Sequence, residues 1–385
     1  MHRLHRTAFA TVLIMALVVA LGLAAGCAAP RPEGEPADNG QAVFYPPPPA
    51  EPHLQYLAHF ASATDVSPGA GETGGLREWL FGQEGAAEQV VNKPYGLAIF
   101  EGAIYVVDTR GHGYTVFDLR AHRVRTVHGA GAGAMVKPVN ITIDADGTRY
   151  VTDTQRDAIL VFDRDDRFVR VLGRPGQFRP VDIAIAGERL YVTDILHHQV
   201  QVLDKRDGAL QFTFGEAGSA EGQFYHPTSL ALGPDGTVYV TDTTNFRIQQ
   251  FSADGGFIRS LGQIGLNPGQ FARPKGLALD REQRIYVVDA AFENVQLLDP
   301  DGRALTFFGG AGDGPGNLNL PTVVKVDYDN VPYFRQFAAP GFEIEYLVLV
   351  ASQFGRNKVA VFGFGSMASG TDDGDGSRGG GMDAS

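Results

Sequence analysis

FYHPTSLALGPDGTVYVTDTTNFRIQQFSADGGFIRSLGQ (residues 224–263) is followed by a second copy of the same plan, FARPKGLALDREQRIYVVDAAFENVQLLDPDGRALTFFGG (271–310). Each landmark recurs 47 residues later, as Pro227 and Pro274 do. Each copy reads as a proline, a short apolar run, a turn, a second run that ends in Asp, and two further runs joined by turns. Short β-branched and aromatic runs bounded by Gly, Pro and Asp predict four consecutive antiparallel strands per copy.

The plan recurs along most of the chain. Successive copies begin 44, 42, 47, 47 and 47 residues apart. The prolines that open them are Pro94, Pro138, Pro180, Pro227, Pro274 and Pro321. A period of this length is typical of repeat folds. Six copies of four antiparallel strands predict an all-β fold, a six-bladed β-propeller.

The fourth copy carries the most specific motif. Its second strand ends in VTD and is followed by Asn245, Arg247, Ile248 and Gln249. This pattern resembles the NHL-repeat family, and the resemblance extends over about 94–364. It implies the propeller fold. It implies much less about function, because one fold carries many functions.

The sixth copy departs from the plan. It contains an additional segment, VPYFRQFAAPGFEIE (331–345), has Ser352 or Gln353 at the motif Asp position, and ends after its third strand. An earlier segment must therefore supply the fourth strand. LQYLAHF (54–60) has the alternation of a strand, whereas LREWLFG (76–82) has helical spacing although its glycine is placed like those of the repeated links. We predict that 54–60 closes the ring and that 76–82 is a short helix, which leaves no exposed sheet edge.

The amino-terminal 26 residues have a basic start followed by an apolar run that ends in small residues. This pattern is typical of an export signal, with an uncleaved membrane anchor as the alternative. Cys27, the only cysteine, follows directly in LAAGC, which resembles a bacterial lipobox, although Ala24 takes the usual leucine position. The resemblance implies that Cys27 carries acyl chains that anchor the protein durably in a membrane. Ala28 in place of Asp implies the outer membrane, with its side left open.

The composition divides the chain into four parts. They are a lipoprotein signal peptide (1–26), a Pro-rich tether (27–53), the propeller (54–364) and a disordered tail of Gly, Ser and Asp (365–385). Such a tail has too few apolar residues to fold, so its acidic residues are expected to be solvated. The formal net charge of −12 makes nucleic acid an unsuitable partner. With Cys27 acylated, no thiol remains for a disulfide or an iron–sulfur cluster, and no cofactor is predicted.

An aspartate ends the second strand of five copies. These residues are Asp108, Asp153, Asp194, Asp242 and Asp289. One per blade, they are too far apart to form a common site. We predict that each accepts hydrogen bonds from backbone N–H groups of the turn that it opens.

The first strand of each copy lines the axis and offers one polar constellation. At the second and fourth positions after the prolines the residues are mostly small, and Lys325 interrupts that pattern. We predict that Lys325 reaches across the channel to Asp182, with Asn140 and Ser229 nearby. A structural plug of the channel is one interpretation. The other is a divalent cation held by Asn140 and Asp182, by resemblance to lactonase-type propellers, which Lys325 would oppose.

The loops after the second strands and the Gly-rich links are expected on one face. Aromatic and Arg side chains gathered there favour contact with a protein. The residues of this candidate partner-binding face are Arg110, His112, Ile195, Leu196, His197, Phe246, Arg247, Phe292, Phe354 and Arg356.

These observations predict a membrane-anchored, non-catalytic scaffold that binds another protein or assembly of the bacterial cell envelope and is monomeric by itself. The segment 331–345, expected on the opposite face, would contribute to binding. Two alternatives stay open. One is a metal-dependent hydrolase or lyase at the channel mouth that uses Asn140 and Asp182. The other is a protein that binds glycan or small ligands in the channel.

Overall fold

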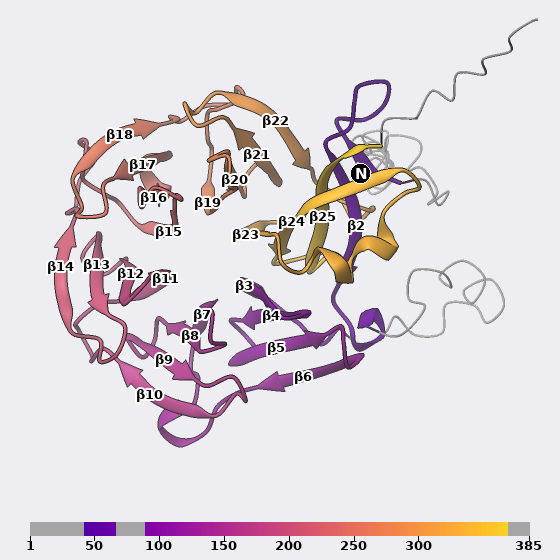
Figure 1. Cartoon of the computed structure of the whole chain (residues 1–385). Helices are drawn as coiled ribbons and strands as arrows, with labels where there is room; N and C mark the ends of the chain where they lie inside the picture. The colour runs from indigo at the N-terminus through magenta and orange to yellow at the C-terminus, as the bar shows by residue number, and fades with distance from the viewer. Residues whose placement is uncertain (1–41, 67–88, 369–385) are drawn as a thin grey trace, which may run out of the picture. The chain divides into compact units, whose positions relative to one another are not determined.

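The computed structural model describes residues 42–66 and 89–368. Within this part, six antiparallel sheets stand around a common axis (Figure 1), which confirms the predicted six-bladed propeller. The innermost strands β3, β7, β11, β15, β19 and β23 contact one another in this order, and β23 contacts β3, which closes the ring. The predicted signal peptide, Cys27, the segment 76–82 and most of the predicted tail lie outside the described residues.

The strands are listed from the axis outward. Blade one contains β3 (Pro94–Phe100), β4 (Ala103–Asp108), β5 (Gly113–Asp118) and β6 (Arg123–Val127); blade two contains β7 (Pro138–Ile143), β8 (Arg149–Asp153), β9 (Ala158–Phe162) and β10 (Phe168–Leu172). Blade three contains β11 (Pro180–Ala186), β12 (Arg189–Asp194), β13 (Gln199–Asp204) and β14 (Leu210–Phe214); blade four contains β15 (Pro227–Leu232), β16 (Val238–Asp242), β17 (Arg247–Phe251) and β18 (Phe257–Leu261). Blade five contains β19 (Pro274–Leu279), β20 (Ile285–Asp289), β21 (Asn294–Leu298) and β22 (Ala304–Gly309); blade six contains β23 (Pro321–Asp327), β24 (Phe342–Ser352), β25 (Val359–Met367), β2 (Leu54–Phe60) and β1 (Phe44–Tyr45).

Short 3₁₀ turns connect some of these strands. They lie at Ala63–Val66, Gly131–Gly133, Thr243–Asn245, Val331–Tyr333 and Arg335–Phe337. No helix among the described residues is long and apolar enough to cross a membrane.

Blade six joins the two ends of the described chain. β2 pairs antiparallel with β25, from Leu54 opposite Phe364 to Phe60 opposite Val359. This pairing confirms that 54–60 is the closing strand.

Two boundaries in blade six differ from the prediction. Phe44 and Tyr45 fall in the predicted tether yet form β1 on the outer edge of β2. Their rings explain this, because Phe44 packs against Phe342 and Tyr45 against Phe308 and Phe362. β25 also runs through Met367, beyond the predicted limit of 364, because the long strand β24 continues to pair with it.

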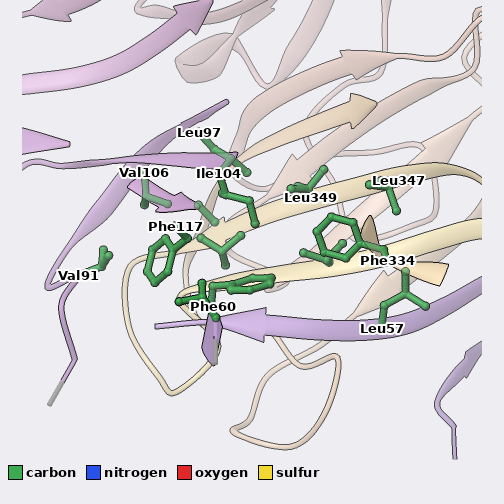
Figure 2. Close-up of a cluster of buried hydrophobic side chains, with 14 of the residues drawn as sticks. Leu57, Phe60, Val91, Leu97, Ile104, Val106, Phe117, Phe334, Leu347 and Leu349 are labelled. Atoms are coloured by element: carbon green, nitrogen blue, oxygen red, sulfur yellow. The ribbon is translucent and has the colours of Figure 1, made fainter. Parts of the chain in front are cut away.

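The core lies in the joints between neighbouring blades. Each joint is filled by aliphatic and aromatic side chains of the second and third strands of the two blades. At the joint of blades six and one (Figure 2), Leu347 and Leu349 belong to the same buried cluster as Ile104 and Phe117. Phe60 of the closing strand packs against Phe117 with ring centroids 5.8 Å apart, so ring closure and core formation depend on the same residues.

The segment 331–345 is part of this joint. Phe334 is fully buried and meets Phe60 edge to face, as Figure 2 shows. The Asn330 side chain accepts a hydrogen bond of 2.6 Å from the N–H of Gly102 in blade one. Gln55 of β2 bonds through its side chain to the backbone at Phe337 and Ala339. Most of the apolar surface of the segment therefore serves the core, which differs from the expected role as a binding arm.

The motif aspartates form a backbone clasp. Asp289 accepts hydrogen bonds from the N–H groups of Ala272 and Arg273, at 2.7 and 3.0 Å, and from those of Ala291 and Phe292. The prediction that the aspartate binds its own turn is therefore confirmed. The bonds to the link before the proline were not predicted, and they tie the entry of each blade to the end of its second strand.

The other four motif aspartates make variants of the same clasp. Asp108 and Asp153 each bind backbone N–H groups of both the link and the turn. At Asp194 and Asp242, side-chain donors take the place of some of these backbone N–H groups. Blade six has Ser352 instead, whose hydroxyl accepts one bond from the N–H of Asn319.

Removal of one clasp should destabilise the whole ring. Asp289→Ala leaves four backbone N–H groups without their acceptor at a buried carboxylate position, so we expect the free energy of unfolding to fall by about 2–4 kcal/mol. Urea unfolding followed by far-ultraviolet circular dichroism measures this. Asp254→Ala is the control, because this side chain is 90% exposed and should change stability little. An equal effect of the two substitutions would contradict the clasp.

A second prediction concerns the segment 331–345. Phe334→Ala opens a cavity between blades six and one, so the free energy of unfolding should fall by about 3–5 kcal/mol. Arg335→Ala, one residue along and exposed, should leave it nearly unchanged. Thermal unfolding of the two variants compares them, and a stable Phe334→Ala protein would show that the segment is not part of the core.

Candidate binding site at the channel mouth

The two openings of the channel differ. The turns after the second strands and the links before the prolines lie at the same end of the ring, because the clasps bond one to the other. We call this end the link face. The turns between first and second strands lie at the opposite end.

Three of the four predicted channel residues meet below the link face. The Asn140 side chain donates to Asp182 Oδ1, and the Ser229 hydroxyl donates to Asp182 Oδ2 at 2.7 Å. The backbone N–H groups of Ile183 and Leu230 also donate to this carboxylate, at 2.8 and 3.1 Å. Asp182 is 1% exposed, and its negative charge is held by four donors from blades two, three and four.

Lys325 does not join them. It forms no ion pair with Asp182, and it does not line the narrow part of the channel where Asp182 lies. The reason is the direction of the side chains. At the second and fourth positions they point to the next blade, as Asn140 does toward Asp182 and Thr142 toward the carbonyl of Ile183. A lysine at the fourth position is therefore directed along the ring and not across it.

The same bonds bear on the metal interpretation. A divalent cation at Asn140 and Asp182 needs free oxygen lone pairs, and those of Asp182 are occupied by protein donors. Within 42–66 and 89–368, no cluster of three or more His, Cys, Asp or Glu side chains is placed to hold a metal ion.

A cavity of about 780 Å³ opens on the link face at the channel mouth. The charged side chains that line it are all basic, and the other lining side chains carry hydroxyl, amide or aliphatic groups. The lining residues are Lys93, Tyr95, Thr109, Lys137, Val139, Thr154, Gln155, Arg179, Val181, Ile195, His226, Thr228 and Gln353. A narrow neck continues toward Asp182 and shares Tyr95, Val181 and Thr228 with the mouth.

The basic residues of the mouth share one sequence position, directly before the blade prolines. In blades one to five that position holds Lys93, Lys137, Arg179, His226 and Arg273, and in blade six it holds Leu320. The clasp fixes this position, because the backbone N–H groups of Lys93, Lys137, Arg179 and Arg273 donate to the motif aspartates. The basic residues before the prolines are visible in the sequence, but the prediction compared only positions after the proline.

Lys275 lines the neck, at the first position after Pro274. Its side chain is 8% exposed, and its ammonium lies 5.0 Å from the centre of the Tyr95 ring, with no hydrogen bond or ion pair to any described residue. Burial, together with the nearby charges of Arg273 and Lys93, lowers the pKa of Lys275 to about 8. It is the only charged residue at the first position, and it, not the predicted Lys325, is the lysine that lines the neck.

The predicted partner-binding residues divide into two groups. His197 and Arg247 bond to Asp194 and Asp242, so they serve the clasps. Leu196 and Phe354 are exposed on the link face, as are Arg110, His112 and Arg356. Ile195, Phe246 and Phe292 are half-buried there. Further exposed apolar side chains of the links were not predicted, namely Val136, Tyr225, Ile264 and Leu266.

The comparisons with known proteins agree with this architecture. The NHL repeat family model matches residues 224–251. Over 44 residues, 11% of this chain, the sequence is 48% identical to the B-box type zinc finger protein ncl-1 of Caenorhabditis elegans, of whose length it spans only 5%. The chain is a six-bladed β-propeller that carries an NHL repeat.

Solved structures show the fold alone. A gluconolactonase from Xanthomonas campestris is similar with a TM-score of 0.52 and 18% identity, over 71% of this chain and 86% of that one. A protein of unknown function from Bacteroides thetaiotaomicron has a TM-score of 0.54 and 16% identity, over 72% and 70% of the two chains. An auxiliary nutrient binding protein from the same organism has a TM-score of 0.52 and 15% identity, over 71% and 69%.

Lys275 should destabilise the folded protein near neutral pH. The folded state holds the Lys275 proton more weakly than the unfolded state, whose lysine pKa is about 10.5, so the contribution of Lys275 to stability rises with pH between about 8 and 10.5. The groups that face it are Lys93, Arg273, Tyr95 and, across the neck, Asp182. We therefore expect Lys275→Met to stabilise the protein by roughly 1–3 kcal/mol at pH 7.

The free energy of unfolding of Lys275→Met should exceed that of the wild type by less and less as pH rises from 8 to 10.5. Urea unfolding at a series of pH values measures this. The exposed Lys137→Met is the matched control and should show neither the gain nor its pH dependence. A Lys275→Met protein less stable than the wild type at pH 7 would contradict the prediction.

Proposed function

We propose that this propeller is a non-catalytic scaffold of the bacterial cell envelope, anchored through Cys27, and that it binds a partner protein with its link face. The observation that carries the proposal is the exposed apolar surface of the links and turns. Leu266 is 82% exposed, Ile264 66% and Phe354 52%. Apolar side chains on loops that a rigid ring holds in place are a feature of protein-binding surfaces.

The same face also carries the exposed guanidinium groups of Arg110 and Arg356. Aromatic and Arg side chains contribute most to the affinity of protein interfaces. The Lys93 ammonium lies 5.8 Å from the centre of the Phe354 ring, so the apolar surface of the link face borders directly on the basic mouth. A partner that covers this face would bury both.

Exposed apolar residues also occur on the outermost strands. They are Val169, Leu210, Ile258, Leu305 and Phe307. They stand on β10, β14, β18 and β22 around the rim of the ring (Figure 1), and these strands belong to separate blades. We assign the contact to the link face, because it combines apolar, Arg and cavity surface, and we use the rim as the control.

A second candidate function is the binding of a small ligand in the channel. The cavity of about 780 Å³ on the link face favours it, since sites for small molecules are concave and of this size. The metal-dependent hydrolase or lyase requires Asp182 as a ligand, and the protein donors around that carboxylate speak against it.

The partner contact can be tested by cross-linking in intact cells. A photoreactive amino acid at Ile264 should capture one defined envelope protein. The double substitution Leu266→Ser and Phe354→Ser removes two large apolar contacts and should reduce this capture about tenfold or more. The matched double substitution Leu210→Ser and Leu305→Ser on the rim should not change it.

The same cells test the anchor. In the variant Cys27→Ser, the protein should leave the membrane fraction and the captured partner should decrease. Absence of a specific product in all cells that contain the photoreactive residue, or equal loss with the link-face and rim variants, would overturn the scaffold proposal.

A further inference from the structure

We infer that the channel mouth binds a small multivalent anion, a molecule with two or more carboxylate or phosphate groups, whose charged end contacts Lys275. This site borders the apolar contact surface of the proposed scaffold, and anion binding does not depend on the partner contact. Three features support the inference: the charges that line the cavity, the unpaired lysine in its neck, and the size and hydrogen-bond donors of the cavity.

The charge of the cavity is opposite to that of the protein. The chain has a formal net charge of −12, yet no Asp or Glu lines the described mouth. Of the basic residues that surround it, only Arg179 has a carboxylate partner among the described residues, Asp157 at 3.1 Å. Lys93, Lys137 and Arg273 have none there. Cations of different blades are thus held close together without counter-charges, a state that an anion would stabilise.

Lys275 extends this basic surface into a place that water reaches poorly. It is almost fully buried, and the charged side chains that act on it most strongly are the cations of Arg273 and Lys93. The face of the Tyr95 ring, 5.0 Å away, offers it negative potential but no full charge. A buried charge without a partner is costly for a folded protein and is rarely retained unless a ligand or reaction requires it.

Among the described residues, no carboxylate pairs with Lys275. Asp182 lines the neck, and its charge is stabilised by four hydrogen bonds from neutral donors of the protein. Lys275 and Asp182 are not an ion pair, although both line the neck. The ammonium of Lys275 is therefore available to a ligand, whereas the oxygens of Asp182 are already used by protein donors.

The remaining lining suits an anion of small-molecule size. Thr109, Thr154 and Thr228 offer hydroxyl donors and Gln155 and Gln353 offer amide donors around a space of about 780 Å³. Cations of blades one, two and three line this space, and Lys275 of blade five lines the neck below it. A monovalent anion would reach only a part of them, so the arrangement favours charges at two or more ends of one ligand.

The test is isothermal titration calorimetry of the full chain, purified from membranes in a neutral detergent. Inorganic pyrophosphate and citrate are the multivalent probes, and acetate is the monovalent control at the same ionic strength. We expect saturable binding of one equivalent of at least one multivalent probe, and at least about tenfold weaker binding of acetate. Binding of pyrophosphate alone assigns a phosphate ligand, and binding of citrate alone assigns a carboxylate ligand.

Lys275→Met should weaken the binding at least about tenfold. This variant is expected to be more stable than the wild type, so a loss of binding cannot be attributed to unfolding. Lys325→Met is the matched control, since Lys325 stands on the inner strand β23 but outside the mouth and the neck, and it should change the affinity by less than about twofold.

Three results would overturn the inference: no saturable binding of either multivalent probe, an unchanged affinity in Lys275→Met, or an equal loss in Lys325→Met. The link-face variant Leu266→Ser, whose side chain lines neither the mouth nor the neck, should keep its anion affinity. Failure of the anion site and failure of the protein contact are therefore distinguishable, because Leu266→Ser changes the apolar surface alone and Lys275→Met changes the neck alone.

Discussion

The hydrogen bonds of the buried aspartate that ends the second strand in five of the six blades are the interaction on which the rest of the molecule depends. Its carboxylate accepts hydrogen bonds from backbone N–H groups of two segments, the link before the blade and the turn after its second strand. Through this bond, each blade fixes its own loops. Because the residue before the proline is one of the donors, the same bond also determines where the basic side chains of the mouth stand. Stability of the ring and charge of the channel mouth thus have a common structural origin.

Blade six shows what replaces the clasp when the aspartate is absent. Lys358, almost fully buried, donates to the carbonyls of Gln353 and Asn92, and so connects blade six to the link of blade one. β2 supplies the fourth strand, and Phe334 fills the joint below it. The sixth blade therefore relies on side-chain packing and on one lysine, where the other blades rely on backbone donors to a carboxylate.

Most of the architecture was predictable because it is repeated. The opening proline recurs six times and the aspartate five times, so an uncertain strand assignment in one copy is resolved by the others. Even the closing strand 54–60 could be identified by its alternation of side chains. The misplaced features occur once. β1 depends on the rings of Phe44 and Tyr45, which find Phe342 and Phe308 only in the folded ring. The segment 331–345 was predicted as an added binding segment, and its burial could not be foreseen because it depends on the joint with blade one.

The channel residues illustrate the same limit. Asn140, Asp182 and Ser229 were grouped correctly because equivalent positions of neighbouring blades must lie side by side. Lys325 was grouped with them because it interrupts the pattern of small residues, but side chains at its position point to the next blade and not across the channel. Lys275 was not among the predicted residues, because the prediction considered the second and fourth positions after the proline and not the first. Its exposure to the neck depends on the bulge between Pro274 and Leu277, which a sequence pattern does not reveal.

The pairing of Leu54 with Phe364 has a consequence for the order of events during biosynthesis. The strand β2 leaves the ribosome before the rest of the ring, and its partner β25 follows only after five complete blades have been made, so the toroid stays an open arc until then. If the chain is secreted through a translocation pore, the circle can be completed only on the far side, after all six blades have passed. There β2 waits, unpaired, for β25.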